Sequence, residues 1–330
     1  MLFSLLNTPP ASASTAAGSG GAGAPGAGAG LAAAGAPAAA RVPKRRPHVL
    51  REGAARALFG TAAALSIAAV ALICLFLLAN GVPAMAEIGL PEFLFGTTWR
   101  PVNDLYGIFP MIVGSLYVTA GAMIVGVPGG LLTALYLSRF ARGRTGSFLR
   151  CGVELLAGIP SVVYGFFGLV IIVPFVRLLG PGTGLSVLAA SLILGIMILP
   201  TVITVAQSAL DAVPSRYYEG ALALGVDHEH AVFKVVAPAA ASGIMAAIVL
   251  GLGRAIGETM AVVMVAGNMP IIPDSLLSGV RTMTANIVLE MGYAADLHRE
   301  ALIATGVVLF VFILLITMLL NVIRKRGEAR

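Results

Sequence analysis

Uncharged apolar runs constrain the fold of this chain more than any other feature. A helix needs about 20 residues to cross the hydrocarbon core of a bilayer, and four runs of that length carry no charge: 57–79, 108–137, 155–176 and 301–323. Two more runs, roughly 185–206 and 239–267, flank a polar loop. With 58% hydrophobic and 11% charged residues, the chain is too apolar for a water-soluble domain. We expect an all-α membrane protein with six transmembrane helices.

Basic residues predict the orientation of these helices, because short loops rich in Lys and Arg stay in the cytoplasm. They gather in 41–56, 139–150 and 324–330. The outer connections hold only a few arginines: Arg100, Arg177, Arg281 and Arg299. Both termini are therefore expected in the cytoplasm, with the first cluster beside anionic membrane lipid of a bacterial plasma membrane. This bias accounts for the net charge of +6, so no nucleic-acid partner is predicted.

The N-terminal segment differs in composition from the rest. Residues 1–40 are mostly Ala, Gly, Pro and Ser, with no acidic or basic residue, and cannot bury a core. We expect a flexible tail with a basic juxtamembrane cluster over 1–56 and a membrane domain over 57–326.

The loop "DAVPSRYYEGALALGVDHEHAVFKVVAP", 211–238, has the pattern of two short helices. Pro214 suits a first helical turn, Gly225 a left-handed stop, and Asp227 the cap of a second helix. This spacing resembles the cytoplasmic loop of ABC importer permeases, with Glu219, Gly220 and Ala221 before Gly225 and with Pro238 at its end; Gly220, Val235 and Ala237 depart from the family pattern. The resemblance implies docking to an ATPase. A solvated connection is the plainer alternative.

The run "GLGRAIGETM", 251–260, places Arg254 and Glu258 inside an apolar segment. Intramembrane charges are costly and usually functional, and residues four apart lie on one helix face. Two readings stay open: a structural ion pair, or a guanidinium that binds a tetrahedral oxyanion while Glu258 orients it. Gly253 and Gly257 would let a second helix approach closely.

Longer stretches narrow the resemblance. The segment "GLGRAIGETMAVVMVAGN", 251–268, closely resembles the fifth-span signature of PstC-type permease subunits of phosphate ABC importers, in the binding-protein-dependent transport permease family. "AGIPSVVYGFFGL", 157–169, "EFLFGTTWRP", 92–101, and "YGIFPMIVGSLYVT", 106–119, resemble other parts of these subunits. The type I ABC importer permease fold is thereby implied.

This resemblance also implies site residues and partners. Arg254, Glu258 and Thr259 would lie on the substrate path; Ser161 and Tyr164 would add hydroxyls there, unless these bond to backbone instead. The implied partners are a PstA-like permease in a heterodimer, a PstB-like ATPase dimer and a PstS-like phosphate-binding protein, with phosphate carried inward.

The chain has no pattern for a nucleotide, a cofactor or a metal. A P-loop needs Gly-Lys-Ser/Thr, and Lys44, Lys234 and Lys325 precede Arg, Val and Arg. Cys74 and Cys151 provide no metal spacing. We expect a permease without enzymatic activity, driven by ATP hydrolysis on a separate subunit.

Three alternatives remain. A permease for another oxyanion (molybdate, sulfate or phosphonate) differs only in cargo. An intramembrane enzyme acting on lipid phosphate needs a base or nucleophile beside Arg254, and all four histidines (His48, His228, His230, His298) fall outside the predicted spans. An ion-gradient transporter usually has several intramembrane carboxylates, and only Glu258 lies deep in a predicted span.

Overall fold

The computed structural model describes residues 49–141 and 143–328 of the 330-residue chain. The predicted tail of 1–40 lies outside the described residues, as does most of the basic cluster that follows it. The chain divides into two units, Met1–Leu58 and Phe59–Arg330, and the architecture below is that of the second unit.

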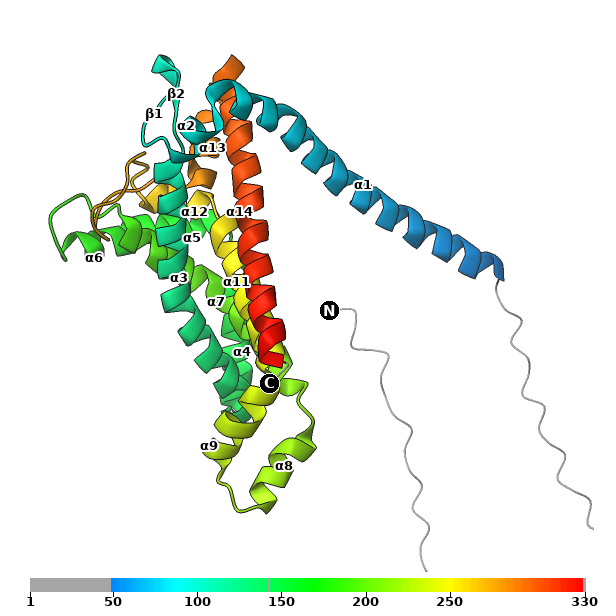
Figure 1. Ribbon diagram of the computed structural model, residues 1–330. Coiled ribbons are helices and arrows are strands. Elements are labelled where there is room, and N and C mark those ends of the chain that lie inside the picture. Colours follow the sequence, from blue (N-terminus) through cyan, green and yellow to red (C-terminus); the bar gives the residue numbers. More distant parts are fainter. Residues whose placement is uncertain (1–48, 142, 329–330) are drawn as a thin grey trace, which may run out of the picture. The chain divides into compact units, whose positions relative to one another are not determined.

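Long apolar helices dominate the described residues (Figure 1). Those long and apolar enough to cross a membrane lie in α1 (Val49–Ile88), α3 (Phe109–Leu135), α7 (Val187–Asp211) and α14 (Asp296–Glu328). Two pairs of bent helices pass the same test together, so six spans are present if each pair counts as one. The all-helical expectation is confirmed.

The third predicted span is not straight. Helix α4 (Gly143–Gly158) ends just before Pro160, and the chain continues through α5 (Ser161–Phe167), η3 (Gly168–Ile172) and α6 (Val173–Arg177), bent by 98°. Proline lacks the N–H that a continuing helix would bond and disfavours helical backbone in the residue before it. The sequence pattern placed this break inside one continuous apolar run.

The fifth predicted span is broken twice. A 70° bend separates 228–239, which includes α9 (His228–Ala231), η4 (Val232–Val236) and α10 (Ala237–Ala239), from α11 (Ala241–Gly257). A second break at Glu258 and Thr259 precedes α12 (Met260–Val265). The expectation of one continuous helix over 239–267 is therefore wrong, because the backbone of Glu258 is extended (φ −72°, ψ 134°).

Helices α3 and α7 lie against each other at the centre of this unit, and small residues make the contact possible. A Cβ at Gly126 would lie 2.7 Å from the Gly195 carbonyl oxygen, and one at Gly130 would lie 2.7 Å from Val202 Cγ1. Side chains of α7 such as Leu194 and Ile198 are almost fully buried. Helix α11 packs against both of them, and α14 packs against α11 and α13 (Met283–Glu290).

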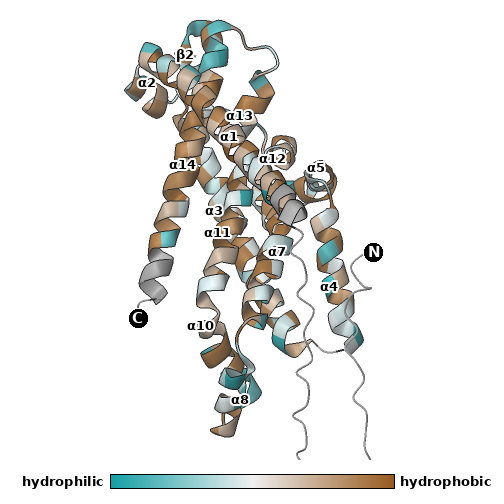
Figure 2. Cartoon of the chain, turned by 90° about the vertical axis from the view of Figure 1, so that its right-hand side faces the viewer, coloured by the Kyte–Doolittle hydropathy of each residue, from teal (hydrophilic) through white to brown (hydrophobic). Residues whose placement is uncertain are grey.

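The two ends of the helices carry the hydrophilic elements (Figure 2). At one end are α2 (Leu90–Phe95) and the antiparallel strands β1 (Trp99–Arg100) and β2 (Leu105–Tyr106), linked by η1 (Pro101–Asn103). Helix α13 (Met283–Glu290) lies at this end too (Figure 1). At the other end, α8 (Ser215–Ala223) and α9 form a hairpin (Figure 1), and Phe140 of η2 (Tyr136–Phe140) contacts His228 of α9.

Candidate functional site

The motif that contains Arg254 and Glu258 forms the second break of the fifth span. Broken helices leave backbone groups without their usual partners, and here side chains supply them. The Glu258 carboxylate accepts a hydrogen bond from the Ala261 N–H at 3.2 Å, which caps α12. The Glu258 carbonyl accepts one from Thr284 Oγ1 at 3.0 Å. The break is thus held by specific bonds.

Arg254 and Glu258 do not form the expected pair. Because α11 ends at Gly257, the two residues do not share a continuous helix face. Among the described residues no ion pair joins them. Arg254 is exposed in this subunit, whereas Glu258 is half-buried and engaged with α12. The structural ion pair considered from the sequence is therefore absent from the described residues.

Ser161 and Tyr164 also follow a helix break, the one at Pro160. Their helix α5 lies against α12, and a Cβ at Gly165 would lie 2.9 Å from Ala261 Cα. The buried Tyr164 hydroxyl donates to the Leu156 carbonyl at 2.7 Å, the backbone bond that sequence analysis left as an alternative.

Thr259 and the glycines of the motif have distinct surroundings. Thr259 is half-buried in the break, and its Oγ1 lies 3.4 Å from the Gly257 carbonyl. A Cβ at Gly251 would lie 2.8 Å from Val202 Cγ2, whereas a Cβ at Gly253 or Gly257 would meet no atom of another element within 4 Å among the described residues. Close helix packing inside the subunit therefore uses Gly251, not the predicted pair of glycines.

The hairpin at the opposite end follows its local signals closely. Pro214 immediately precedes α8, Gly225 has a left-handed φ of 84°, and Asp227 caps α9 by accepting from the His230 N–H at 3.3 Å. The expectations for Gly225 and Asp227 are confirmed, whereas Pro214 lies one position before the first helical turn in which it was expected. Glu219 and Gly220 are exposed on α8, while Ala221 is buried.

Aromatic contacts fix the hairpin to the end of the second span. The Tyr218 hydroxyl and His228 Nδ1 are 2.7 Å apart, and the His228 ring meets the Phe140 ring edge-on at 4.8 Å between centroids. Pro238 lies in the short α10 that connects the hairpin to α11. The hairpin is thus attached to both the second and the fifth spans.

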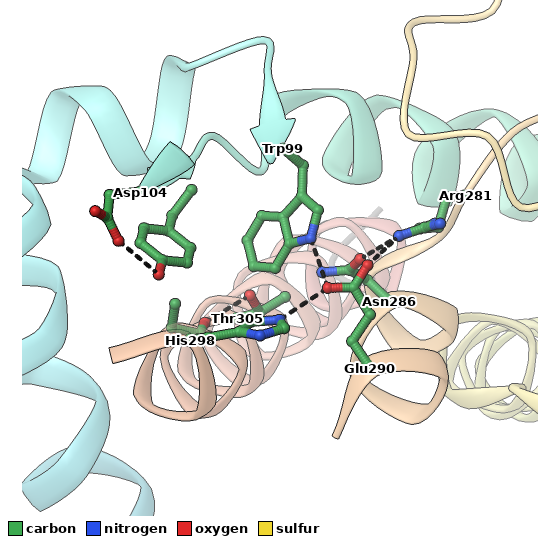
Figure 3. A network of polar contacts seen from close by, with 9 residues as sticks. Trp99, Asp104, Arg281, Asn286, Glu290, His298 and Thr305 are labelled. Carbon is green, nitrogen blue, oxygen red and sulfur yellow. Dashed lines mark hydrogen bonds and ion pairs between the residues drawn. The ribbon is translucent and has the colours of Figure 1, made fainter. Parts of the chain in front are cut away.

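A buried polar cluster at the hydrophilic end near β1 was not predicted from the sequence (Figure 3). Its centre is Glu290, only 6% exposed. The Glu290 carboxylate accepts from Trp99 Nε1 at 2.8 Å, from Arg281 Nη1 at 2.6 Å and from His298 Nε2 at 2.9 Å. Arg281 also donates to Asn286 Oδ1 at 3.0 Å. A buried charge of this kind needs such partners.

The same α13 also reaches the fifth-span break. Thr282 caps α13, and the Met283 N–H donates to Ser115 Oγ of α3 at 3.0 Å. Thr284 then donates to the Glu258 carbonyl. The i,i+4 spacing of Asn286 and Glu290 after a Thr cap was the one sequence signal for this element; the partner Trp99 lies 191 positions away.

Comparison with known proteins decides the family. A family described as "binding-protein-dependent transport system inner membrane component" matches residues 126–328. This chain belongs to that family of permeases. The match spans both broken segments and the hairpin, and the several long apolar helices agree with a multi-pass inner-membrane protein.

Individual permeases resemble the chain over most of its length. A probable ABC transporter permease protein, YqgH of Bacillus subtilis, is 35% identical, with 87% of this chain and 95% of the relative covered. The phosphate transport system permease protein PstC of Mesorhizobium japonicum is 33% identical, with 78% and 85% covered. These relatives are transport permeases, and the PstC-type resemblance is confirmed.

A solved structure supports the same fold. The inward-facing MetNI methionine ABC transporter contains a chain that superposes with a TM-score of 0.52 at 21% identity, covering 70% of this permease and 99% of that chain. The type I ABC importer permease fold expected from the sequence is therefore confirmed. None of these comparisons assigns a role to Arg254 or to the hairpin, which remain candidates.

Proposed function

We propose that this permease imports inorganic phosphate, with a PstA-like permease forming the other half of the path. Support comes from relatives named as phosphate transport system permease proteins and from the chemistry around Arg254. A guanidinium presents several N–H donors in one plane, which suits the oxygen atoms of a tetrahedral oxyanion.

The observation that carries the proposal is that the Arg254 side chain is exposed and forms no ion pair with Glu258 among the described residues. Arg254 lies on α11, while the Glu258 carboxylate is turned to cap α12. An arginine inside a membrane span without a carboxylate partner is stable where water or an anion reaches it. Arg254 therefore faces the path and meets the anion, while Glu258 shapes the break beside it.

The hydroxyl residues take secondary roles on this path. Ser161 begins α5 and Thr259 lies in the break itself, so both are placed beside the helix ends that flank Arg254. Tyr164 is already bonded to the Leu156 carbonyl. Its ring therefore orients α4 relative to α5 instead of donating its hydroxyl to the anion.

ATP hydrolysis reaches the permease through the α8–α9 hairpin. Glu219 is exposed on this hairpin, as are the large apolar side chains Tyr217 and Leu224, at 48% and 86%. Exposed apolar residues beside charges are typical of a docking surface. A separate PstB-like ATPase dimer binds there, on the cytoplasmic side to which the basic clusters assign both chain termini. A PstS-like phosphate-binding protein docks at the opposite end.

The cargo is tested by ATP-driven uptake of labelled phosphate in vesicles that contain the wild-type complex and its binding protein. Unlabelled phosphate is expected to abolish uptake, whereas sulfate, molybdate and phosphonate at equal concentration leave it within about twofold of the uninhibited rate. Uptake of one of those anions in place of phosphate would overturn the cargo while leaving the permease architecture intact.

A further inference from the structure

We propose that α13 couples the β1–β2 hairpin to the break at Glu258 and Thr259 in the fifth span. Glu290 and Thr284 are the positioning residues toward the two ends of α13. The inference rests on the proposed function for its direction: the end that carries β1 and β2 receives the binding protein, and the break lies beside Arg254. It adds a physical connection between the two.

The outer end of this connection is built on one carboxylate. Glu290 accepts from Trp99 of β1, from Arg281 before α13 and from His298 of α14. Trp99 is 5% exposed, and the Trp99 and Tyr106 rings meet edge-on at 5.7 Å. A displacement of the β1–β2 hairpin therefore moves Glu290 with it, because a buried hydrogen-bonded charge is costly to separate from its partners.

The inner end is a single hydroxyl. The Thr284 side chain is buried and donates to the Glu258 carbonyl at 3.0 Å. That carbonyl belongs to the extended residue that ends α11 and precedes α12. Thr284 and Glu290 lie six residues apart on one helix, which corresponds to about 9 Å along its axis. A short helix of this length moves as a rigid body.

Arg281 keeps the two ends in register. Its Nε donates to the Asn268 carbonyl at 2.9 Å, just after α12, and its Nη1 donates to both Asn286 and Glu290 of α13. Arg281 therefore links the chain segment after α12 to α13 itself. A rotation of α13 changes the backbone at both sides of α12, which is the segment that Glu258 caps.

The tip of the β1–β2 hairpin is exposed in this subunit, so another protein can bind it. Val102 is 97% exposed, and Arg100 and Asp104 are exposed beside it. The partner expected there is the anion-loaded binding protein. Docking of the binding protein would displace Trp99, then Glu290 and α13, and then, through Thr284, the break at Glu258.

The test is a double-mutant cycle measured as uptake per assembled complex. Trp99→Phe removes the indole N–H and keeps an aromatic ring, and Thr284→Val removes the hydroxyl at nearly constant volume. Each is expected to lower uptake about fivefold, the factor that one hydrogen bond contributes. The double variant is expected to remain near fivefold. Sites that act independently would give about twenty-fivefold, since distant effects multiply.

Matched variants separate coupling from loss of structure. Thr284→Ser keeps the hydroxyl and is expected to return uptake to within about twofold of wild type. Thr305→Val removes another buried hydroxyl, one that among the described residues bonds only the Ala301 carbonyl of its own helix. Uptake by this variant is expected to stay within about twofold of wild type, since such a bond contributes little to other elements.

The outcomes are distinct from those that test the cargo. Wild-type uptake of sulfate or molybdate instead of phosphate would overturn the proposed cargo, and the same variant-to-wild-type ratios would then be measured with that anion. A Thr284→Val complex that transports at the wild-type rate would overturn the coupling. A double variant that equals the product of the two single variants would overturn it as well.

Discussion

The indole N–H of Trp99 donates to the Glu290 carboxylate at 2.8 Å across 191 positions of the chain. This bond joins the strand β1 to the end of α13, and its donor is the only tryptophan of the chain. The fluorescence of Trp99 therefore reports directly on the buried cluster around Glu290.

Removal of the Glu290 carboxylate is expected to destabilise the fold. Glu290→Ala leaves the half-buried Arg281 without its carboxylate, and breaking a buried ion pair in this way costs about 3 kcal/mol of unfolding free energy. Thermal unfolding followed by Trp99 fluorescence measures the effect. Glu87→Ala, which removes an exposed carboxylate at the end of α1, should change stability by less than about 0.5 kcal/mol. Equal losses in the two variants would contradict the central role of Glu290.

High pH is expected to loosen the β1–β2 hairpin. Burial, followed by the charge of Asp104 and the hydrogen bond to it, raises the pKa of Tyr106 above its ordinary value of 10.0. The neutral phenol is the form that the fold favours, so its contribution to stability is complete below pH 10 and is lost as the pH rises through the raised pKa. Trp99 emission should be constant up to about pH 9.5 and shift above pH 10.

Tyr106→Phe is the control for this pH dependence. The variant lacks the titrating hydroxyl, so its loss of stability above pH 10 should be smaller than that of the wild type. An unchanged alkaline profile in Tyr106→Phe would show that another group is responsible.

The contact between the two broken spans is expected to tolerate no added methyl group. In Gly165→Ala the new Cβ would lie 2.8 Å from Met264 Sδ and 2.9 Å from Ala261 Cα. Such overpacking costs about 1–3 kcal/mol and should lower uptake by shifting α5 from α12. Gly152→Ala in α4 meets no atom within 4 Å and should be neutral or slightly stabilising; a comparable loss in both variants would refute the close approach at Gly165.

The turn of the cytoplasmic hairpin is expected to require a left-handed residue. Gly225 has a φ of 84°, which a β-branched side chain strongly disfavours. Gly225→Val should reduce uptake and the stimulation of the ATPase together, whereas Gly225→Asn, which adopts left-handed backbone more readily, should retain most of both. If Gly225→Val keeps both uptake and ATPase stimulation, docking of the ATPase on this hairpin is contradicted.

Local signals and length were sufficient to predict most of the architecture. The long helices follow from apolar runs that can cross a bilayer, and the turn at Gly225 and the cap at Asp227 follow from the conformations that these residues prefer. The break at Glu258 was not predicted, because an apolar run contains no signal for backbone direction. Arg254 and Glu258 were consequently expected on one helix face.

Long-range contacts account for the rest of what the sequence did not predict. In the sequence, Trp99, Glu290 and His298 lie in three separate segments. Only the folded chain brings these residues together. The one local signal in the sequence is the spacing of Asn286 and Glu290, and it does not identify Trp99 as a partner. The same applies to Thr284, whose partner is a backbone carbonyl that becomes available only where α11 ends.

The most direct test of this account is binding-protein-dependent, ATP-driven phosphate uptake by the complex that carries Arg254→Gln. Arg177→Gln, which removes an exposed arginine at the end of α6, serves as the matched control. We expect uptake to fall at least about tenfold in Arg254→Gln, because a hydrogen bond to a charged group contributes about 1.5–3 kcal/mol, and the lower value already corresponds to about tenfold. Uptake should remain near the wild-type rate in Arg177→Gln. Wild-type phosphate uptake by Arg254→Gln would contradict the assignment of Arg254 to the anion path.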